Sequence, residues 1–294
     1  MIITRKEIVL YMLKVKNIYK KFDTFELQDI SFNLPKGKIM GLIGPNGAGK
    51  TTTIKLILNM IKNQTGEIKI FNKNLFEHEL EIKEHIGVVL DSNYFLNNWT
   101  IIEVEKSVGM FYRTWNNRKF KTLVENFNLN SEKKVKDLSK GMQMKLMLAC
   151  ALSHDAKLLI LDEPTSGLDP VSRNKLLEIL LEYIKDGEHS VLFSTHITTD
   201  LEKVANSITY LNNGKLIYTG SKNDFISSYK IANGKIRNLD SNLENKLIGL
   251  KKFYNEFEGL ITTEDIKYFP KILFRPASMD DIIIYTNKGV NENV

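Results

Sequence analysis

The stretch that decides the fold is GPNGAGKT, residues Gly44 to Thr51. It fits the pattern Gly, any four residues, Gly, Lys, Ser or Thr. Apolar residues 39–43 precede it as a short buried strand, and apolar side chains recur at helical spacing over 54–61. This order predicts a phosphate loop, because glycines let backbone N–H groups point at a phosphate and the helix N-terminus adds positive potential. Lys50 would reach the outer phosphates and the Thr51 hydroxyl would lie on Mg²⁺; a glycine-rich turn without a ligand is the alternative.

The composition is that of a globular protein with one large domain or two ordinary ones: 294 residues, 43% hydrophobic and 26% charged. No stretch reaches the roughly 18 consecutive apolar residues of a membrane span, and nothing at the start is typical of a cleaved signal. Cys150 is the single cysteine, which excludes an internal disulfide and is typical of a reducing compartment. A net charge of +6 raises nucleic acid or an anionic membrane surface as partners. Because the lysines are scattered rather than grouped, we expect no nucleic acid.

The patterns along the chain predict three parts. Residues 1–11 precede the first regular alternation of apolar and polar side chains, and we expect an extension without regular structure there. Residues 12–220 alternate predicted strands and helices, with an inserted helical region over about 92–152. Residues 221–294 carry no catalytic chemistry and predict a small appended α/β domain.

A second buried strand ends in two carboxylates. Residues 158–161 read Leu-Leu-Ile-Leu, and Asp162 and Glu163 follow directly. Ligands of open α/β sheets lie at the carboxyl ends of the strands, and a carboxylate is costly to bury there unless it meets a cation. We therefore predict Asp162 on Mg²⁺ and Glu163, which points to the other face, as a general base toward water. Two ordinary residues at a strand end are the alternative.

Three further side chains are candidates by their position. His196 follows the apolar strand of residues 190–194 and is the third strand end with polar chemistry beside the predicted phosphate loop, although a lone histidine there is more often structural. Phe22 lies in a charged, turn-like setting where an aromatic ring can stack on a base; a core residue is the alternative. Ser139 is a predicted N-cap for the helix that follows it.

Five stretches stand in one order along the chain: GPNGAGKT at 44–51, LSKGM at 138–142, LLILDE at 158–163, SGLD at 166–169 and STH at 194–196. Together they resemble the nucleotide-binding subunit of an ABC transporter, over about Leu13 to Gly220. The resemblance implies an α/β fold of the P-loop NTPase class, with a mixed sheet core, an N-terminal antiparallel β part and an inserted helical subdomain. Here a small C-terminal α/β extension follows.

The resemblance also implies how an ATP site is built. Two subunits would close head to tail around two ATP molecules, each held by the phosphate loop of one subunit and the LSKGM stretch of the other. Glu163 would activate the attacking water, His196 would position it at the γ-phosphate, and Asp169 would organise the dimer seam. The implied metal positions are Thr51, Asp162 and Asp91. The residues implied to contact ATP within the subunit are Phe22, Gly44, Pro45, Asn46, Gly47, Ala48, Gly49, Lys50, Thr51 and Thr52, and those implied in trans are Ser139, Lys140, Gly141 and Met142.

Two parts of the sequence depart from the family pattern. Lys140 and Met142 stand where LSGGQ has Gly and Gln, whereas Ser139 and Gly141, the phosphate-facing pair, are kept. Asp91 stands where the family usually has a glutamine, at the end of the strand that leads into the helical region, and no other Gln occurs nearby to replace it. Aspartate is shorter and charged. It can still bind Mg²⁺ through water, but we expect it to weaken nucleotide binding when Mg²⁺ is scarce.

The Leu90-Asp91 ending, together with LSKGM, resembles a branch of ABC-2-type exporters that includes drug, bacitracin, lantibiotic and cytolytic-peptide resistance systems. This resemblance implies a separate multi-span membrane permease, and either a homodimer or a related second ATPase subunit. It also implies a peripheral location at the cytoplasmic face of the cell membrane. The alternatives are a soluble ABC ATPase acting on ribosomes or DNA, and a nucleotide-binding regulator with weak turnover, which only Asp91 favours.

Overall fold

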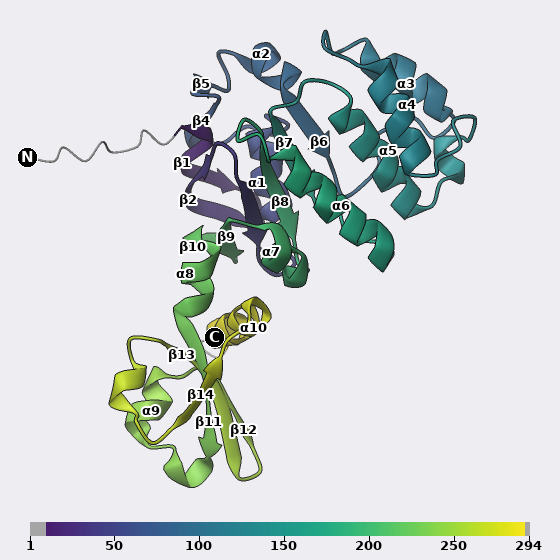
Figure 1. Ribbon diagram of the computed structural model, residues 1–294. Helices are drawn as coiled ribbons and strands as arrows, with labels where there is room; N and C mark the ends of the chain where they lie inside the picture. Colours follow the sequence, from purple (N-terminus) through teal and green to yellow (C-terminus); the bar gives the residue numbers. More distant parts are fainter. Residues whose placement is uncertain (1–9, 292–294) are drawn as a thin grey trace, which may run out of the picture.

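The computed structural model describes residues 10–291, and one half of the larger of its two sheets consists of parallel strands (Figure 1). Their order is β9 (Ser207–Asn212), β3 (Ile39–Ile43), β8 (Ser190–Thr195), β7 (Leu158–Asp162) and β6 (Ile86–Val89). Every residue of β3, β7 and β8 is buried. Buried parallel strands are covered on both faces, which explains why these segments read as continuous apolar runs.

An antiparallel part extends this sheet at the β9 edge. It contains β10 (Lys215–Ser221), β2 (Glu26–Pro35), β1 (Tyr11–Lys21), β4 (Thr65–Ile70) and the short β5 (Lys73–Asn74). The predicted extension over residues 1–11 falls mostly outside the described residues, and its last residue, Tyr11, already belongs to β1.

Helix α1 (Lys50–Ile57) begins directly at the glycine stretch, and its buried apolar side chains belong to the core beneath the antiparallel part. The helical region over about 92–152 contains α3 (Ile101–Gly109), α4 (Asn117–Asn126) and α5 (Lys140–Leu152). The short α2 (Glu79–Glu84) precedes β6. Helix α5 packs on β6, which attaches the helical region to the sheet.

The two faces of the sheet belong to two cores. Along β7, Leu159 and Leu161 pack with the helical region, whereas Leu158 and Ile160 pack with α1 and the antiparallel part, as the alternation of side chains in a strand requires. Helix α6 (Pro170–Tyr183) follows β7.

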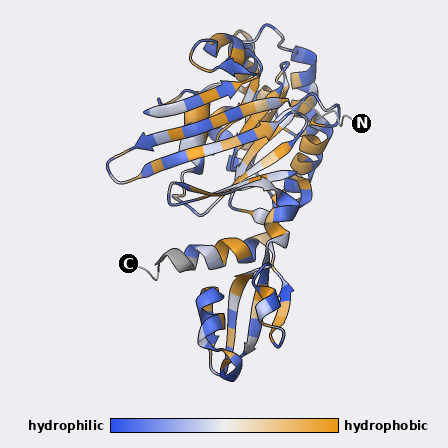
Figure 2. Ribbon diagram, turned by 90° about the vertical axis from the view of Figure 1, so that its left-hand side faces the viewer, coloured by the Kyte–Doolittle hydropathy of each residue, from blue (hydrophilic) through white to orange (hydrophobic). Residues whose placement is uncertain are grey.

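The second sheet belongs to the C-terminal part, called here the accessory domain (residues 222–291). After α8 (Lys222–Ser227), its strands pair antiparallel in the order β12, β13, β11 and β14. Their bounds are Ile248–Phe253, Glu256–Thr262, Tyr229–Lys235 and Leu273–Pro276. Helix α9 (Ser241–Lys246) packs on one face of this sheet, and α10 (Met279–Asn291) returns to lie between the two sheets (Figure 2).

The mixed sheet with helices on both faces confirms the predicted α/β class. Helices α3, α4 and α5 occur where the sequence predicts an inserted helical region, over about 92–152. Helix α7 (Thr198–Val204) was not predicted. Between residues 10 and 291, no helix combines the length and apolar character that a membrane span needs.

Candidate active site

The phosphate loop, residues 44–51, joins the carboxyl end of β3 to α1. At two of its positions only glycine fits. Gly44 has φ 153°, and a Cβ there would lie 2.2 Å from the carbonyl oxygen of Leu211. Gly49 has φ 105°, and its Cβ would lie 2.5 Å from a side-chain carbon of Leu27. Both conformations favour glycine, and neither position has room for a side chain. The loop is therefore shaped by close packing on its outer side.

Lys50 is 6% exposed, and its ammonium group points back into this loop. Nζ donates to the carbonyl oxygens of Gly44 at 2.9 Å and Pro45 at 3.3 Å. It also stands 3.6 Å from Oε1 of Glu163. A buried ammonium needs such partners, and these place its charge at the centre of the loop, where a phosphate would bind.

Asp162 ends β7 and is fully buried. One carboxylate oxygen accepts a hydrogen bond from the Ser194 hydroxyl, whereas Oδ2 has no hydrogen-bond partner within the described part of the chain. Burial raises the pKa of Asp162, hydrogen bonds from Ser194 and Thr51 oppose this shift, and the charges of Asp91 and Glu163 add to it. A buried carboxylate with one free oxygen beside a threonine hydroxyl fits a hard cation such as Mg²⁺.

Glu163 follows with a left-handed backbone, φ 51°. Its N–H donates to the carbonyl oxygen of Ser194 at 3.0 Å, which ties the turn to β8. Side-chain Oε2 lies 2.7 Å from Nδ1 of His196 and accepts a hydrogen bond from the His196 N–H at 3.3 Å. A left-handed non-glycine residue costs on the order of 1–3 kcal/mol and persists where the surroundings impose it. Here the carboxylate beyond this turn contacts His196 and Lys50.

His196 lies just beyond β8, and its side chain is half exposed. The next N–H, of Ile197, donates to the Thr195 hydroxyl at 2.9 Å, so the backbone beside the histidine is fixed. The imidazole is therefore anchored at its base and accessible at its ring.

The structure places Phe22 beside the phosphate loop. Its ring is 38% exposed and stacks on Phe25 with centroids 6.4 Å apart, and the Phe25 ring in turn borders Gly49. The ammonium of Lys20 lies 5.6 Å from the Phe22 centroid. Phe22 is thus absent from both cores of the ATPase part and presents part of its ring to solvent.

The LSKGM stretch and Asp169 form a separate group. Ser139 caps α5, its Oγ accepting from the Met142 N–H at 3.3 Å. Lys140 and Gly141 border Gly167. Within residues 10–291, no hydrogen bond or ion pair joins residues 139–142 to the phosphate loop. Within one chain, residues 139–142 are therefore not bonded to the phosphate loop.

Asp169 caps helix α6. Its carboxylate accepts hydrogen bonds from the N–H groups of Val171 and Ser172, both at 3.0 Å. Hydrogen bonds from Ser172 and Val171 lower the pKa of Asp169. The observed contacts of Asp169 therefore hold the start of α6.

The remaining predicted residues differ in accessibility. Asp91 is exposed after β6, and among the described residues its side chain makes no hydrogen bond or ion pair, although its charge contributes to the raised pKa of Asp162. Asn46 and Gly47 are exposed at the tip of the phosphate loop, and Ala48 is buried. Thr52 is half-buried in the first turn of α1.

Sequence reasoning missed Ser194 and Phe25. Ser194 donates to Asp162 from the neighbouring strand and supports the Glu163 turn, its Oγ accepting from the Glu163 N–H at 3.2 Å. The sequence singled out Ser194 only as the first residue of the STH stretch, near the end of a buried strand, and nothing in the sequence indicated its bond to Asp162. Phe25 gave no signal, because an aromatic residue at the start of a strand is ordinary.

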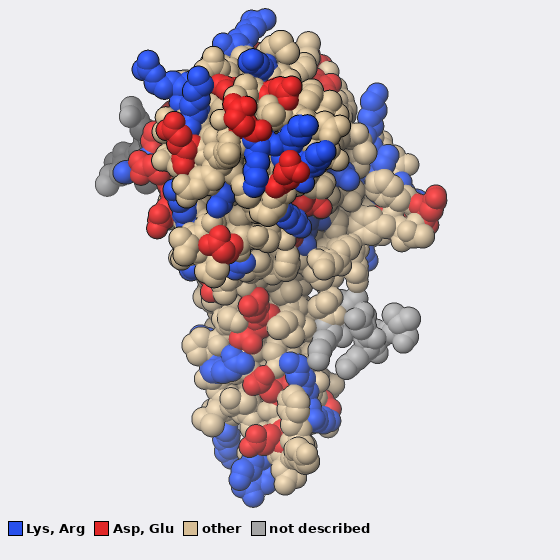
Figure 3. All heavy atoms as spheres, turned by 90° about the vertical axis from the view of Figure 1, so that its right-hand side faces the viewer, with Lys and Arg blue, Asp and Glu red and all other residues tan. Residues whose placement is uncertain are grey.

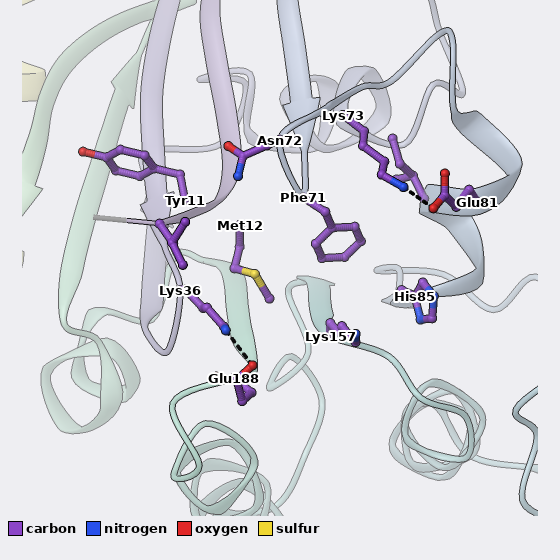
Figure 4. Close-up of a pocket in the computed structure, with 12 residues that line it drawn as sticks. Tyr11, Met12, Lys36, Phe71, Asn72, Lys73, Glu81, His85, Lys157 and Glu188 are labelled. Atoms are coloured by element: carbon purple, nitrogen blue, oxygen red, sulfur yellow. Dashed lines mark hydrogen bonds and ion pairs between the residues drawn. The ribbon is translucent and has the colours of Figure 1, made fainter. Parts of the chain in front are cut away.

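A hollow of about 310 Å³ lies at the opposite end of the sheet (Figure 4). Lys36, His85 and Lys157 line it from the segments that enter β3, β6 and β7. Lys36 forms an ion pair with Glu188 at 2.5 Å, and Lys73 pairs with Glu81 across the same opening. This hollow is separate from the candidate active site, which lies at the carboxyl ends of these strands.

Comparison with known sequences gives consistent matches. The family model described as "ABC transporter" matches residues 27–166. The lantibiotic transport ATP-binding protein of Streptococcus pyogenes is 33% identical over 218 residues, covering 72% of this chain and 93% of that protein. The bacitracin transport ATP-binding protein of Bacillus licheniformis is 32% identical over 213 residues, covering 70% of this chain and 68% of that protein.

Two solved structures show the same architecture. The ATP-binding subunit of an ABC transporter is 30% identical, with a TM-score of 0.67 over 72% of this chain and 91% of that chain. A dimeric ATP-binding cassette in a post-hydrolysis state, bound to ADP and phosphate, has a TM-score of 0.64 over 71% of this chain and 98% of that chain. Its identity is 24%, so the likeness is one of fold.

Proposed function

Because the chain belongs to the ABC transporter ATP-binding family, we propose that it drives a bacterial exporter of antimicrobial peptides or drugs. As an ABC ATPase it couples ATP hydrolysis to transport. One observation supports the ATPase assignment most directly. The phosphate loop, the Asp162-Glu163 pair and His196 lie together at the carboxyl ends of β3, β7 and β8, which are neighbours in the sheet.

The residues present fit MgATP. In our proposal Lys50 turns from the loop carbonyls to the β- and γ-phosphates, while the loop N–H groups and Thr52 hold the phosphate oxygens. Thr51 and the free Oδ2 of Asp162 would hold Mg²⁺, with Asp91 acting through water. Bound there, Mg²⁺ would neutralise phosphate charge. Phe22 would stack on the adenine.

Glu163 is the proposed general base. It would accept a proton from water as the water oxygen attacks the γ-phosphorus and the bond from that phosphorus to the bridging oxygen breaks, releasing ADP. His196, which now contacts the Glu163 carboxylate, would hold the γ-phosphate and fix the water.

The second half of the site would come from another ATPase subunit, identical or related. Ser139 and Gly141 stand at the first turn of α5, where N–H groups and the helix dipole favour an anion. Lys140 and Met142 would flank the same phosphate, and Asp169 would lie at the seam. The separation of this group from the phosphate loop within one chain supports contact in trans.

A groove of about 270 Å³ supports a permease contact. It lies between the helical region and the sheet, a few residues from Asp91, and Met60, Leu90 and Tyr94 are among its lining residues. Met60 and Tyr94 are exposed, as are Met110 and Phe111 at the end of α3. Exposed apolar side chains that line one groove, as Met60 and Tyr94 do, are typical of an interaction site. We propose that a separate multi-span permease docks here and holds the chain at the cytoplasmic face of the membrane.

The transported class is proposed from the relatives, two of which are named for transport of a lantibiotic and of bacitracin. The comparisons do not favour a soluble ATPase acting on ribosomes or DNA. On the face shown in Figure 3, Lys and Arg are interspersed with Asp and Glu rather than gathered into one basic patch.

The test of the ATPase assignment is size-exclusion chromatography with light scattering on Glu163→Gln, with and without MgATP. We expect a monomer that becomes an ATP-bound dimer, and loss of phosphate release relative to the parent. Equal hydrolysis by parent and variant would remove Glu163 from its role. A monomer that binds ATP without dimerising would refute the homodimer and leave the related second subunit.

A further inference from the structure

Helix α7 connects the candidate catalytic histidine to the accessory domain. It begins at Thr198, two residues after His196, and the fixed Ile197 backbone joins the two. Thr198 is 2% exposed, and its hydroxyl donates to Oδ1 of Asp280, in the first turn of α10, at 2.6 Å. This bond links residues 82 positions apart.

The other end of α7 is held by the accessory domain as well. Lys222, the first residue of α8, donates from Nζ to the carbonyl oxygen of Glu202 at 2.6 Å. The N–H of Met279, the first residue of α10, donates to the Glu202 carboxylate at 3.3 Å. Lys222, where the chain enters the accessory domain, and Met279, where the last helix of that domain begins, therefore both hold one seven-residue helix.

On its other side, α7 faces α6. Lys203 donates to the side-chain oxygen of Asn174 at 3.1 Å, and Arg173 stands 3.9 Å from the buried carboxylate of Asp200. Helix α6 begins at the Asp169 cap. Helix α7 thus lies between the helix that starts at the proposed dimer seam and the helix that closes the accessory domain.

The packing beneath these contacts is continuous. Met279 and Ile282 of α10 are fully buried in the same core as Leu201 of α7 and Phe193 of β8. Close-packed interiors transmit displacements instead of absorbing them. A shift of α10 would therefore shift α7 and the His196 segment with it.

We propose that Asp280 is a positioning residue for ATP hydrolysis. By accepting the Thr198 hydrogen bond, it holds the first turn of α7, and through that turn it holds His196 where the γ-phosphate binds. The accessory domain is then part of the hydrolytic machinery, although it touches no nucleotide. This inference rests on the proposed role of His196.

The experiment is steady-state ATP hydrolysis by the full chain, comparing the parent with Asp280→Ala, Thr198→Val and the double variant. One hydrogen bond contributes about 1 kcal/mol, so we expect kcat to fall about three- to tenfold in each single variant. The KM for ATP should change little, because Phe22 and the phosphate loop are untouched. The kcat of the double variant should be no lower than the kcat of either single variant. Asp280→Asn keeps the acceptor oxygen and should restore most of kcat.

Thr286→Val is the matched control. It removes another hydroxyl bond between α10 and the ATPase part, the one to Tyr210 at 2.8 Å, but that bond reaches β9 and not α7. We expect the melting temperature of Thr286→Val to fall about as much as that of Asp280→Ala, and its kcat to equal that of the parent. Parent-like kcat in both Asp280→Ala and Thr198→Val would overturn the proposal. So would a loss of kcat in Thr286→Val equal to that in Asp280→Ala. A parent that hydrolyses no ATP, or a His196→Ala variant that hydrolyses ATP as fast as the parent, would refute the proposed function instead.

Discussion

The Nδ1 atom of His196 lies 2.7 Å from Oε2 of Glu163, and the backbone N–H of His196 donates to the same oxygen. The ammonium of Lys50 stands 3.6 Å from the other carboxylate oxygen. Both partners are groups that we propose for the γ-phosphate. ATP would therefore compete with Glu163 for them, and the carboxylate would be released toward water only when a γ-phosphate is bound.

The first prediction concerns His196→Ala. Hydrolysis should fall about a hundredfold or more, the range seen when a proton-transfer or positioning group is lost, while ATP still binds through the phosphate loop. Phosphate release and ATP affinity measure the two effects separately. His189→Ala, which removes a histidine paired with Asp186 at 2.7 Å and remote from the loop, is the control. Similar losses in the two variants would contradict the assignment.

The second prediction concerns Asp162→Asn and stability. Burial raises the pKa of this carboxyl in the folded chain, so its ionised form destabilises the fold at neutral pH. The variant should melt at a higher temperature than the parent at pH 7 without ligand. The difference should shrink as pH falls from the raised pKa to the ordinary value, because the buried carboxyl of the parent is protonated across this window while the unfolded chain is still ionised, and it should vanish below the ordinary value, where both states are protonated.

Added MgATP should reverse that order, because only the parent retains the charged oxygen for Mg²⁺. Ser194→Ala is the control: it removes a hydrogen bond that stabilises the ionised carboxylate and should lower the melting temperature at pH 7. If Asp162→Asn melts below the parent under ligand-free conditions at pH 7, the destabilising role of the charge is wrong.

The sequence predicts where the phosphate loop and the Asp162-Glu163 pair lie in the sheet better than it predicts the contacts around them, for a physical reason. The phosphate loop and the Asp162-Glu163 pair are contiguous, and each follows an apolar run whose strand direction fixes where it ends. The Ser194 bond to Asp162 crosses 32 positions and the Thr198 bond to Asp280 crosses 82. Such contacts leave no local pattern, since serine, threonine and aspartate are common in loops and caps.

The accessory domain illustrates the same limit. The sequence of this domain predicted a mixture of strands and helices. It did not predict an antiparallel sheet with β11 at its interior, nor the contact between α10 and α7. Helix α7 itself is short and begins without a side-chain cap, so neither periodicity nor a start signal indicated it. Its stability comes from the helices on either side.

The third prediction concerns Phe22→Ala. Base stacking on an aromatic ring contributes about 1–3 kcal/mol, so the dissociation constant for ATP should rise about tenfold or more, with kcat at saturation little changed. Phe22→Trp should retain affinity. Inorganic triphosphate, which has no base, is the matched ligand and should bind parent and variant equally. Equal weakening of both ligands would mean that Phe22 supports the loop and does not contact adenine.

The fourth prediction concerns Asp91→Gln, which installs the glutamine usual in the resembling family. Asp91 is exposed, and its charge adds to the raised pKa of the buried Asp162, so a γ-phosphate would meet two carboxylates near the metal position. Removing one should tighten ATP binding several-fold in EDTA, because like charges repel over short distances. The gain should shrink with increasing Mg²⁺, which neutralises the same charge. Glu125→Gln on α4 is the control for net charge, because it removes the same negative charge from another exposed position. An identical Mg²⁺ dependence for Asp91→Gln and the parent would show that Asp91 lies outside the field of the phosphates.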